Sequence, residues 1–154
     1  MIRFRKLAVL AAACIVAVGL ESGVQAQGGD EAAIKYRQNI MKSVGGHTGA
    51  IAQVVKGESP HKAHLERHAR ALHDLLSMAP DAFRQQTSGG DTRAKPEIWS
   101  DSAGFKRAAD EAVAAASAFV EASASGDEGA IGEKIKAVFD GCKGCHRDYR
   151  EKKE

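Results

Sequence analysis

Apolar residues recur at steps of three and four along four separate stretches of this 154-residue chain. This spacing places them on one face of a helix, and segments rich in Gly, Ser or Pro separate the stretches. No stretch shows the period-two alternation of a β-strand. The sequence therefore predicts an all-α domain whose helices cover residues 31–55, 61–78, 96–124 and 128–150.

Each predicted helix carries a stripe of residues that we expect to face the interior. The first helix has a seam with a seven-residue repeat, which suits a helix bundle: Ile34, Arg37, Met41, Val44, Thr48, Ile51 and Val55. The second has Leu65, Ala69, Leu72, Leu75 and Leu76. The third has Phe105, Ala109, Ala112, Ala116 and Phe119, and the fourth has Ile131, Ile135, Val138, Cys142, Cys145 and Tyr149. The alanines of the third stripe leave room for a close neighbour or for a flat cofactor.

Residues 142–146 read Cys-Lys-Gly-Cys-His, and C-x-x-C-H is the attachment signature of c-type haem. The two thiols add across the haem vinyl groups, and the histidine that follows is held under the iron as its proximal ligand. The motif therefore predicts one covalent haem c, with Cys142 and Cys145 as its thioethers and His146 as the proximal ligand. Because both cysteines lie on the inward stripe, the haem must enter the bundle. A thiol redox pair or a zinc site is the alternative use of the two cysteines.

The N-terminus has the features of a secretory signal peptide. Arg3, Arg5 and Lys6 precede an apolar run over residues 7–20, and Val24-Gln25-Ala26 resembles a signal-peptidase site. The apolar run is shorter than the roughly 20 residues of a membrane-spanning helix, which disfavours a retained anchor. We therefore predict a signal peptide over residues 1–26, a mature domain over 27–154, and export to the periplasm.

The charge of the mature chain excludes some classes of partner. Removal of residues 1–26 would leave 19 basic and 19 acidic residues of the original 22 and 20. Nucleic-acid binding requires a strongly basic face, so we do not expect it. Periplasmic redox proteins are the expected partners, and the sequence does not identify them.

Several motifs together resemble the class II cytochromes c, the family of cytochrome c prime and its low-spin relatives. They are Tyr36-Arg37-Gln38, Gly57, the run 95–100 and the run 142–150, with the C-x-x-C-H in the last helix. The resemblance implies an antiparallel up-down-up-down four-helix bundle with one haem, often as a homodimer. It also implies that Arg37 and Gln38 lie near the haem propionates, and that Asp91 lies near the haem.

Met41 is the candidate distal ligand. It follows Arg37 by one helical turn, so both side chains should face the interior. A thioether opposite His146 would make the iron six-coordinate and suited to electron transfer. Residues 40–47 resemble the methionine-ligated branch of the family, so we expect an electron carrier rather than an enzyme. The alternative is that Met41 only packs and that a five-coordinate haem binds nitric oxide or carbon monoxide.

The remaining histidines allow two other sites. His47 is a rival distal ligand from the flank of the first helix. His61, His64 and His68 share one face of the second helix, with His73 nearby, and could hold zinc or copper. Charged neighbours surround this face, and no cysteine or carboxylate from another helix is evident to complete a site. A solvated face is therefore the favoured interpretation.

Overall fold

The computed structural model describes residues 22–87 and 89–152, and the predicted signal peptide falls largely outside them. Its boundary at residue 26 stays a prediction. The described helices are α1 (Ser22–Val55), a short 3-10 turn (Lys62–His64), α2 (Leu65–Ser77), α3 (Ala79–Ala82), α4 (Glu97–Ser100), α5 (Ser102–Ser125) and α6 (Glu128–Tyr149). Within this part of the chain the only β pairing is an isolated bridge between Ala94 and Arg150. None of its helices is long and apolar enough to cross a membrane.

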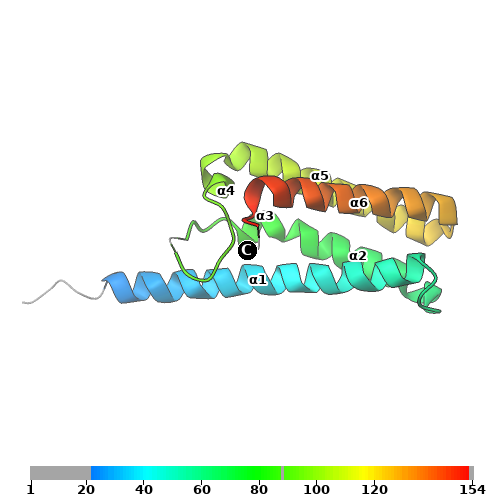
Figure 1. Ribbon diagram of the computed structural model, residues 1–154, viewed down its shortest axis with the longest axis horizontal. Coiled ribbons are helices and arrows are strands. Elements are labelled where there is room, and N and C mark those ends of the chain that lie inside the picture. The colour runs from blue at the N-terminus through cyan, green and yellow to red at the C-terminus, as the bar shows by residue number, and fades with distance from the viewer. Residues whose placement is uncertain (1–21, 88, 153–154) are drawn as a thin grey trace, which may run out of the picture.

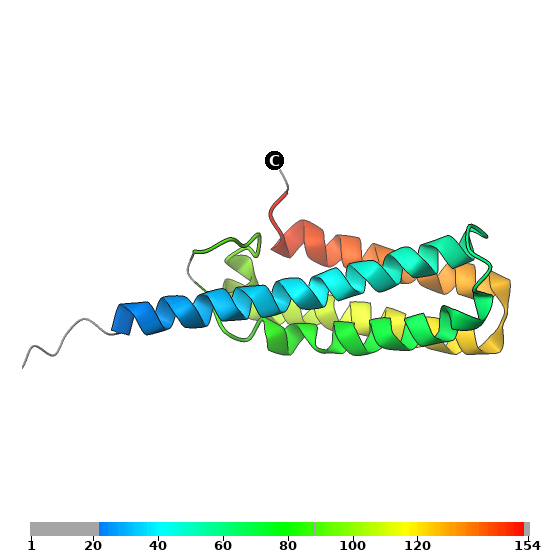
Figure 2. The same ribbon diagram turned by 90° about the horizontal axis from the view of Figure 1, so that it is seen from below.

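The four long helices form the antiparallel bundle implied by the resemblance (Figures 1 and 2). α1 packs along α2, α2 along α5, and α5 along α6. The remaining side, between α1 and α6, is not among the main helix contacts. α3, α4 and the loop between them lie at the end of the bundle where α6 finishes (Figure 1). The bundle is therefore closed on three sides and loosely closed on the fourth.

The predicted stripes form the core, with one correction on α1. Val55 was expected inside but is 38% exposed, whereas Val54 is 7% exposed. The reason is geometric: a straight helix drifts by about 20° per heptad from a strict seven-residue repeat. By the last turn of α1 that drift has brought Val54 to the inner face. Ile40, which was also left out of the seam, is buried as well.

Three predicted helix boundaries are wrong. The first helix was expected to begin at residue 31, but α1 begins at Ser22. The second helix was expected to stop before Pro80, but the chain continues as α3 with Pro80 in its first turn. Proline is tolerated there because the first helical N–H groups have no partner within the helix. The third helix was expected to be continuous over 96–124, but it breaks at Asp101 between α4 and α5.

Asp101, at the break between α4 and α5, links the start of α5 to the end of α6. Its Oδ1 accepts a hydrogen bond of 3.1 Å from the backbone N–H of Gly104, which caps α5. Its Oδ2 accepts one of 2.9 Å from the hydroxyl of Tyr149, in the last turn of α6. Asp101 therefore fixes the start of α5 against the end of α6, next to the C-x-x-C-H segment.

Candidate haem-binding site

A cavity of about 710 Å³ lies on the loosely closed side of the bundle, between α1 and α6. This volume is within the range of small-molecule and cofactor sites. Its inner wall consists of buried apolar side chains: Ile34, Val44, Leu76, Ala79, Ile98, Phe105, Ala109 and Ala112. Exposed residues mark its opening: Lys42, Asp91, Arg93 and Arg150. The cavity is therefore apolar along its inner wall and charged at its opening.

α6 brings Cys142, Cys145 and His146 to the cavity wall, as the sequence predicted. Residues three and four apart lie on one helix face, so the motif presents both thiols and the imidazole together. Both cysteines are free and half-buried, and burial raises the pKa of each thiol. Burial lowers the pKa of His146, and the positive charges of Arg150 and Arg93 lower it further. A neutral imidazole is the form that binds a metal.

These features fit a haem. The cavity is apolar where a porphyrin would lie, the two thiols share one wall at the spacing of the attachment motif, and the neutral imidazole follows them directly. Cys142, Cys145 and His146 are the residues that would hold the group.

Arg37 forms part of the opposite wall and is the most buried charged side chain described, at 2% exposure. Its guanidinium donates hydrogen bonds to the Gln85 carbonyl oxygen (3.2 Å) and to Thr87 Oγ1 (2.8 Å). It also lies 5.1 Å from the ring centroid of Phe83 and 5.5 Å from that of Trp99. Burial lowers the pKa of Arg37, and Asp30 opposes that change. Arg37 therefore anchors the loop that follows α3 as well as lining the cavity.

Gln38 and Asp91 also line the cavity, and they contact each other. The Gln38 amide donates a 2.7 Å hydrogen bond to the Asp91 carbonyl oxygen, which leaves the Asp91 carboxylate exposed at the opening. The preceding Gly90 has a φ of +81°, and a Cβ there would lie 2.8 Å from Ile34 Cδ1. The structure thus brings together the three residues that the resemblance placed near the haem. Their contact with a propionate stays a prediction.

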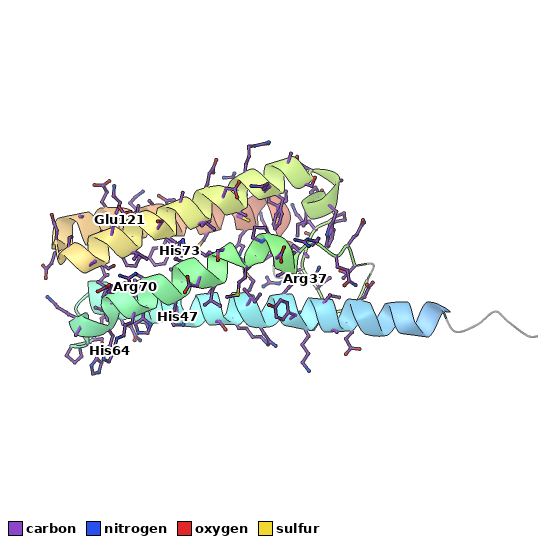
Figure 3. The ribbon with its side chains drawn as sticks, turned by 180° about the vertical axis from the view of Figure 1, so that it is seen from behind. Arg37, His47, His64, Arg70, His73 and Glu121 are labelled. Atoms are coloured by element: carbon purple, nitrogen blue, oxygen red, sulfur yellow. The ribbon has the colours of Figure 1, made fainter. Side chains whose placement is uncertain are left out.

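Met41 is half-buried and lines the cavity from α1, while His146 lines it from α6. His47 lies away from the cavity lining, and Figure 3 shows it well along the helix from Arg37. The Nδ1 atoms of His47 and His68 are 2.9 Å apart, so one ring donates a hydrogen bond to the other. His47 thus has a partner on α2 and lies outside the cavity that Met41 lines.

The helix-two histidines do not assemble a metal site within the described residues. No group of three or more His, Cys, Asp or Glu side chains there could hold a metal ion. His61 and His64 stack on each other at a ring-centroid distance of 5.1 Å, and both are exposed. His61 and His64 are therefore solvated as expected, whereas His68 is half-buried against His47 of α1.

The contact between His47 and His68 predicts a loss of stability in acid. Burial lowers the pKa of His68 below its ordinary 6.5, and the neighbouring His47 and His64 lower it further. The unfolded chain therefore binds the proton more readily, so the contribution of His68 is present above pH 6.5 and lost as the pH falls through its lowered pKa. Denaturant unfolding at pH 7.5 and 5.5 should show a smaller decrease in unfolding free energy for His68→Gln than for the parent. The exposed control His61→Gln should behave like the parent, and equal pH dependence in all three proteins would contradict the prediction.

Sequence reasoning missed several residues of the site. Arg93 at the opening is an exposed polar residue with no periodic signal. Lys42 and Arg150 lie at the opening too, and they were noted only as parts of the runs 40–47 and 142–150. Trp99 was noted only as part of a motif, yet its indole N–H donates a 2.8 Å hydrogen bond to the Phe83 carbonyl oxygen and fixes the loop beside Arg37. The signal available in the sequence was that Trp99 is an aromatic residue within the family-like run 95–100.

Comparison with known proteins identifies the family. The sequence profile described as Cytochrome C′ matches residues 32–150. The chain belongs to the cytochrome c prime family. It is 36% identical over 122 residues to the cytochrome c prime of Pararhodospirillum photometricum, an alignment that covers 79% of this chain and 98% of that protein. It is also 32% identical over 117 residues to cytochrome c-556 of Agrobacterium tumefaciens (strain apple 185), covering 75% and 91%.

The solved structures of this family agree with the fold. A nitric oxide complex of a leucine-to-alanine mutant of cytochrome c prime from Alcaligenes xylosoxidans superposes with a TM-score of 0.74. That protein is 34% identical, and the match covers 80% of this chain and 97% of the other. Membership of the cytochrome c prime family thus agrees with the haem-type cavity described above.

Proposed function

We propose that this member of the cytochrome c prime family is an exported protein with one covalent haem c that binds nitric oxide or carbon monoxide. The observation that carries the proposal is the apolar cavity with Cys142, Cys145 and His146 on one wall. The nitric oxide complex of the relative from Alcaligenes xylosoxidans supports the gas-binding interpretation over the electron carrier that we expected from residues 40–47. We infer a binding protein rather than an enzyme.

Haem supplies an iron that can take a diatomic gas as a ligand. The protein residues would attach the haem, supply a ligand to its iron and exclude water. Cys142 and Cys145 would fasten the group to α6, and His146 would offer its neutral imidazole to the iron. Buried side chains of α2, α5 and α4 exclude water from the cavity. In this proposal Met41 covers the distal side by packing, and its flexible thioether side chain yields to a small ligand.

The second candidate function is the methionine-ligated electron carrier. One observation favours it: Met41 and His146 line the same cavity from α1 and α6. A thioether in that place can bind haem iron and raise its reduction potential. The two functions differ only in whether Met41 bonds the metal.

Replacing Met41 with alanine separates the two functions. If Met41 only packs, the ferric holoprotein is high-spin by absorption and EPR, and Met41→Ala leaves that spectrum unchanged. The ferrous variant should bind carbon monoxide about tenfold faster, which corresponds to removing about 1.4 kcal/mol of steric barrier. Met78→Ala is the control, since Met78 is exposed and lies outside the cavity lining.

The opposite result is equally clear. A low-spin ferric spectrum with a far-red charge-transfer band that disappears in Met41→Ala would assign the methionine-ligated carrier and reject the gas-binding proposal. Mass spectrometry of the same preparation tests export, because processing near Ala26 should leave a chain that begins at Gln27.

A further inference from the structure

Three cations surround the opening of the cavity, and we call Lys42, Arg93 and Arg150 the rim. They come from α1, from the loop before α4 and from the residue after α6, and all three are exposed. Within the described part of the chain, the structure gives none of the three side chains an ion pair or a hydrogen bond. The rim therefore consists of cations whose charge no described side chain neutralises.

Several other surface cations have carboxylate partners. Lys62 pairs with Glu128 at 2.7 Å, and Lys136 pairs with Asp140 at 2.6 Å. Arg70, Lys106 and Arg147 also have carboxylate partners. Asp91 is the one acidic residue in the cavity lining, so the opening keeps an excess of positive charge. Because the predicted mature chain is close to neutral, this excess is a local feature.

A gas-binding haem of this kind needs an electron from outside the chain. Nitric oxide and carbon monoxide bind tightly to ferrous iron, and export places the protein in an oxidising compartment. The exposed residues of the lining mark the opening as a route from solvent to the cavity. We expect an electron donor to approach the haem there, beside the rim.

We propose that the rim is a docking surface for the acidic face of an electron-transfer protein that reduces the haem iron. The inference rests on the proposed haem and goes beyond its ligand binding. One electron passes from the donor to the ferric iron, the donor is oxidised by one electron, and no bond or proton moves. Unneutralised charge beside an apolar cavity focuses the local field, which accelerates the approach of oppositely charged partners.

Two small reductants of opposite charge test the rim directly. The ferric holoprotein is reduced by ferrous EDTA, an anion, and by hexaammineruthenium(II), a cation, under stopped flow. The ratio of the two rate constants reports local charge, because a change in driving force affects both reagents alike. Raising the salt from 10 to 150 mM shortens the Debye length from about 30 to about 8 Å, so the rate with the anion should fall and the ratio with it.

Paired substitutions that remove the same charge, at the rim or elsewhere, then test whether the rim causes the difference between the two reductants. Arg93→Gln with Arg150→Gln should lower the anion-to-cation ratio about threefold or more at low salt, at the modest end of electrostatic steering. Lys62→Gln with Lys136→Gln removes the same formal charge outside the cavity lining and should lower the ratio less than the arginine variant does. If the arginine variant does not load haem, Lys42→Gln and the salt dependence of the parent carry the test.

One outcome of these rate measurements would overturn the inference. A ratio that is insensitive to salt and to the rim variants would mean that the rim is neutralised in the holoprotein, for example by the haem propionates.

Poly-L-glutamate should slow reduction by ferrous EDTA at low salt while poly-L-lysine does not. If poly-L-glutamate has no effect, the rim recognises small anions and not an acidic protein. Carbon monoxide binding, measured on the same samples, reports separately whether the proposed function holds.

Discussion

Replacing both Cys142 and Cys145 with alanine is expected to abolish covalent haem attachment completely. The two thiols lie half-buried on the α6 wall of the cavity, and the described residues contain no other cysteine. The exported variant should show no added haem mass on the peptide that contains residues 142–146, and acid–acetone extraction should remove all haem colour. Its melting temperature should fall because a ligand that binds only the folded state stabilises it.

Gly144→Ala is the matched control for this experiment. It changes the same pentad but keeps both thiols and His146. Nothing lies within 4 Å of a Cβ at residue 144, so the methyl group has space. The control should carry haem like the parent. Haem mass retained on the double cysteine variant would reject the attachment assignment.

Gly104→Ala is expected to destabilise the protein by about 3 kcal/mol, through overpacking and loss of a helix cap. A Cβ at residue 104 would lie 2.0 Å from Asp101 Oδ2 and 2.4 Å from the Tyr149 hydroxyl oxygen. It would therefore push apart the hydrogen bond that fixes the start of α5 against the end of α6. Denaturant unfolding of the holoprotein, monitored by circular dichroism, measures the change.

Gly132→Ala provides the comparison on α6. Residue 132 is exposed, and a Cβ there meets nothing within 4 Å. Alanine is favoured over glycine inside a helix by about 1 kcal/mol, so this variant should be slightly more stable than the parent. If both variants change stability by the same amount and in the same direction, the contacts around Gly104 are not responsible.

The bundle was predictable because its signals are local and periodic. The stripe from Phe105 to Phe119 and the stripe from Ile131 to Val138 are buried as the spacing predicted. The boundaries were harder because they depend on tertiary contacts. The helix breaks at Asp101 where its carboxylate finds both Gly104 and Tyr149, and Tyr149 is 48 residues away in sequence. No local pattern contains that partner.

In the candidate site, too, one wall could be predicted from the sequence and the other could not. A five-residue motif was sufficient to place Cys142, Cys145 and His146 on one wall, because helical spacing alone sets their common face. The opposite wall depends on how a loop folds back. Arg37 contacts Gln85 and Thr87, about 50 positions further along the chain, and these contacts were not predictable. The fine position of Met41 over the cavity depends on the same packing.

The weak contact between α1 and α6 has a consequence for maturation of the protein. α1 packs on α2 and α3, so its face toward α6 has no extensive helical partner in the described chain. A porphyrin fastened to α6 would fill the gap and act as the missing wall between the first and last helices. Cofactor loading would then complete the packing between α1 and α6.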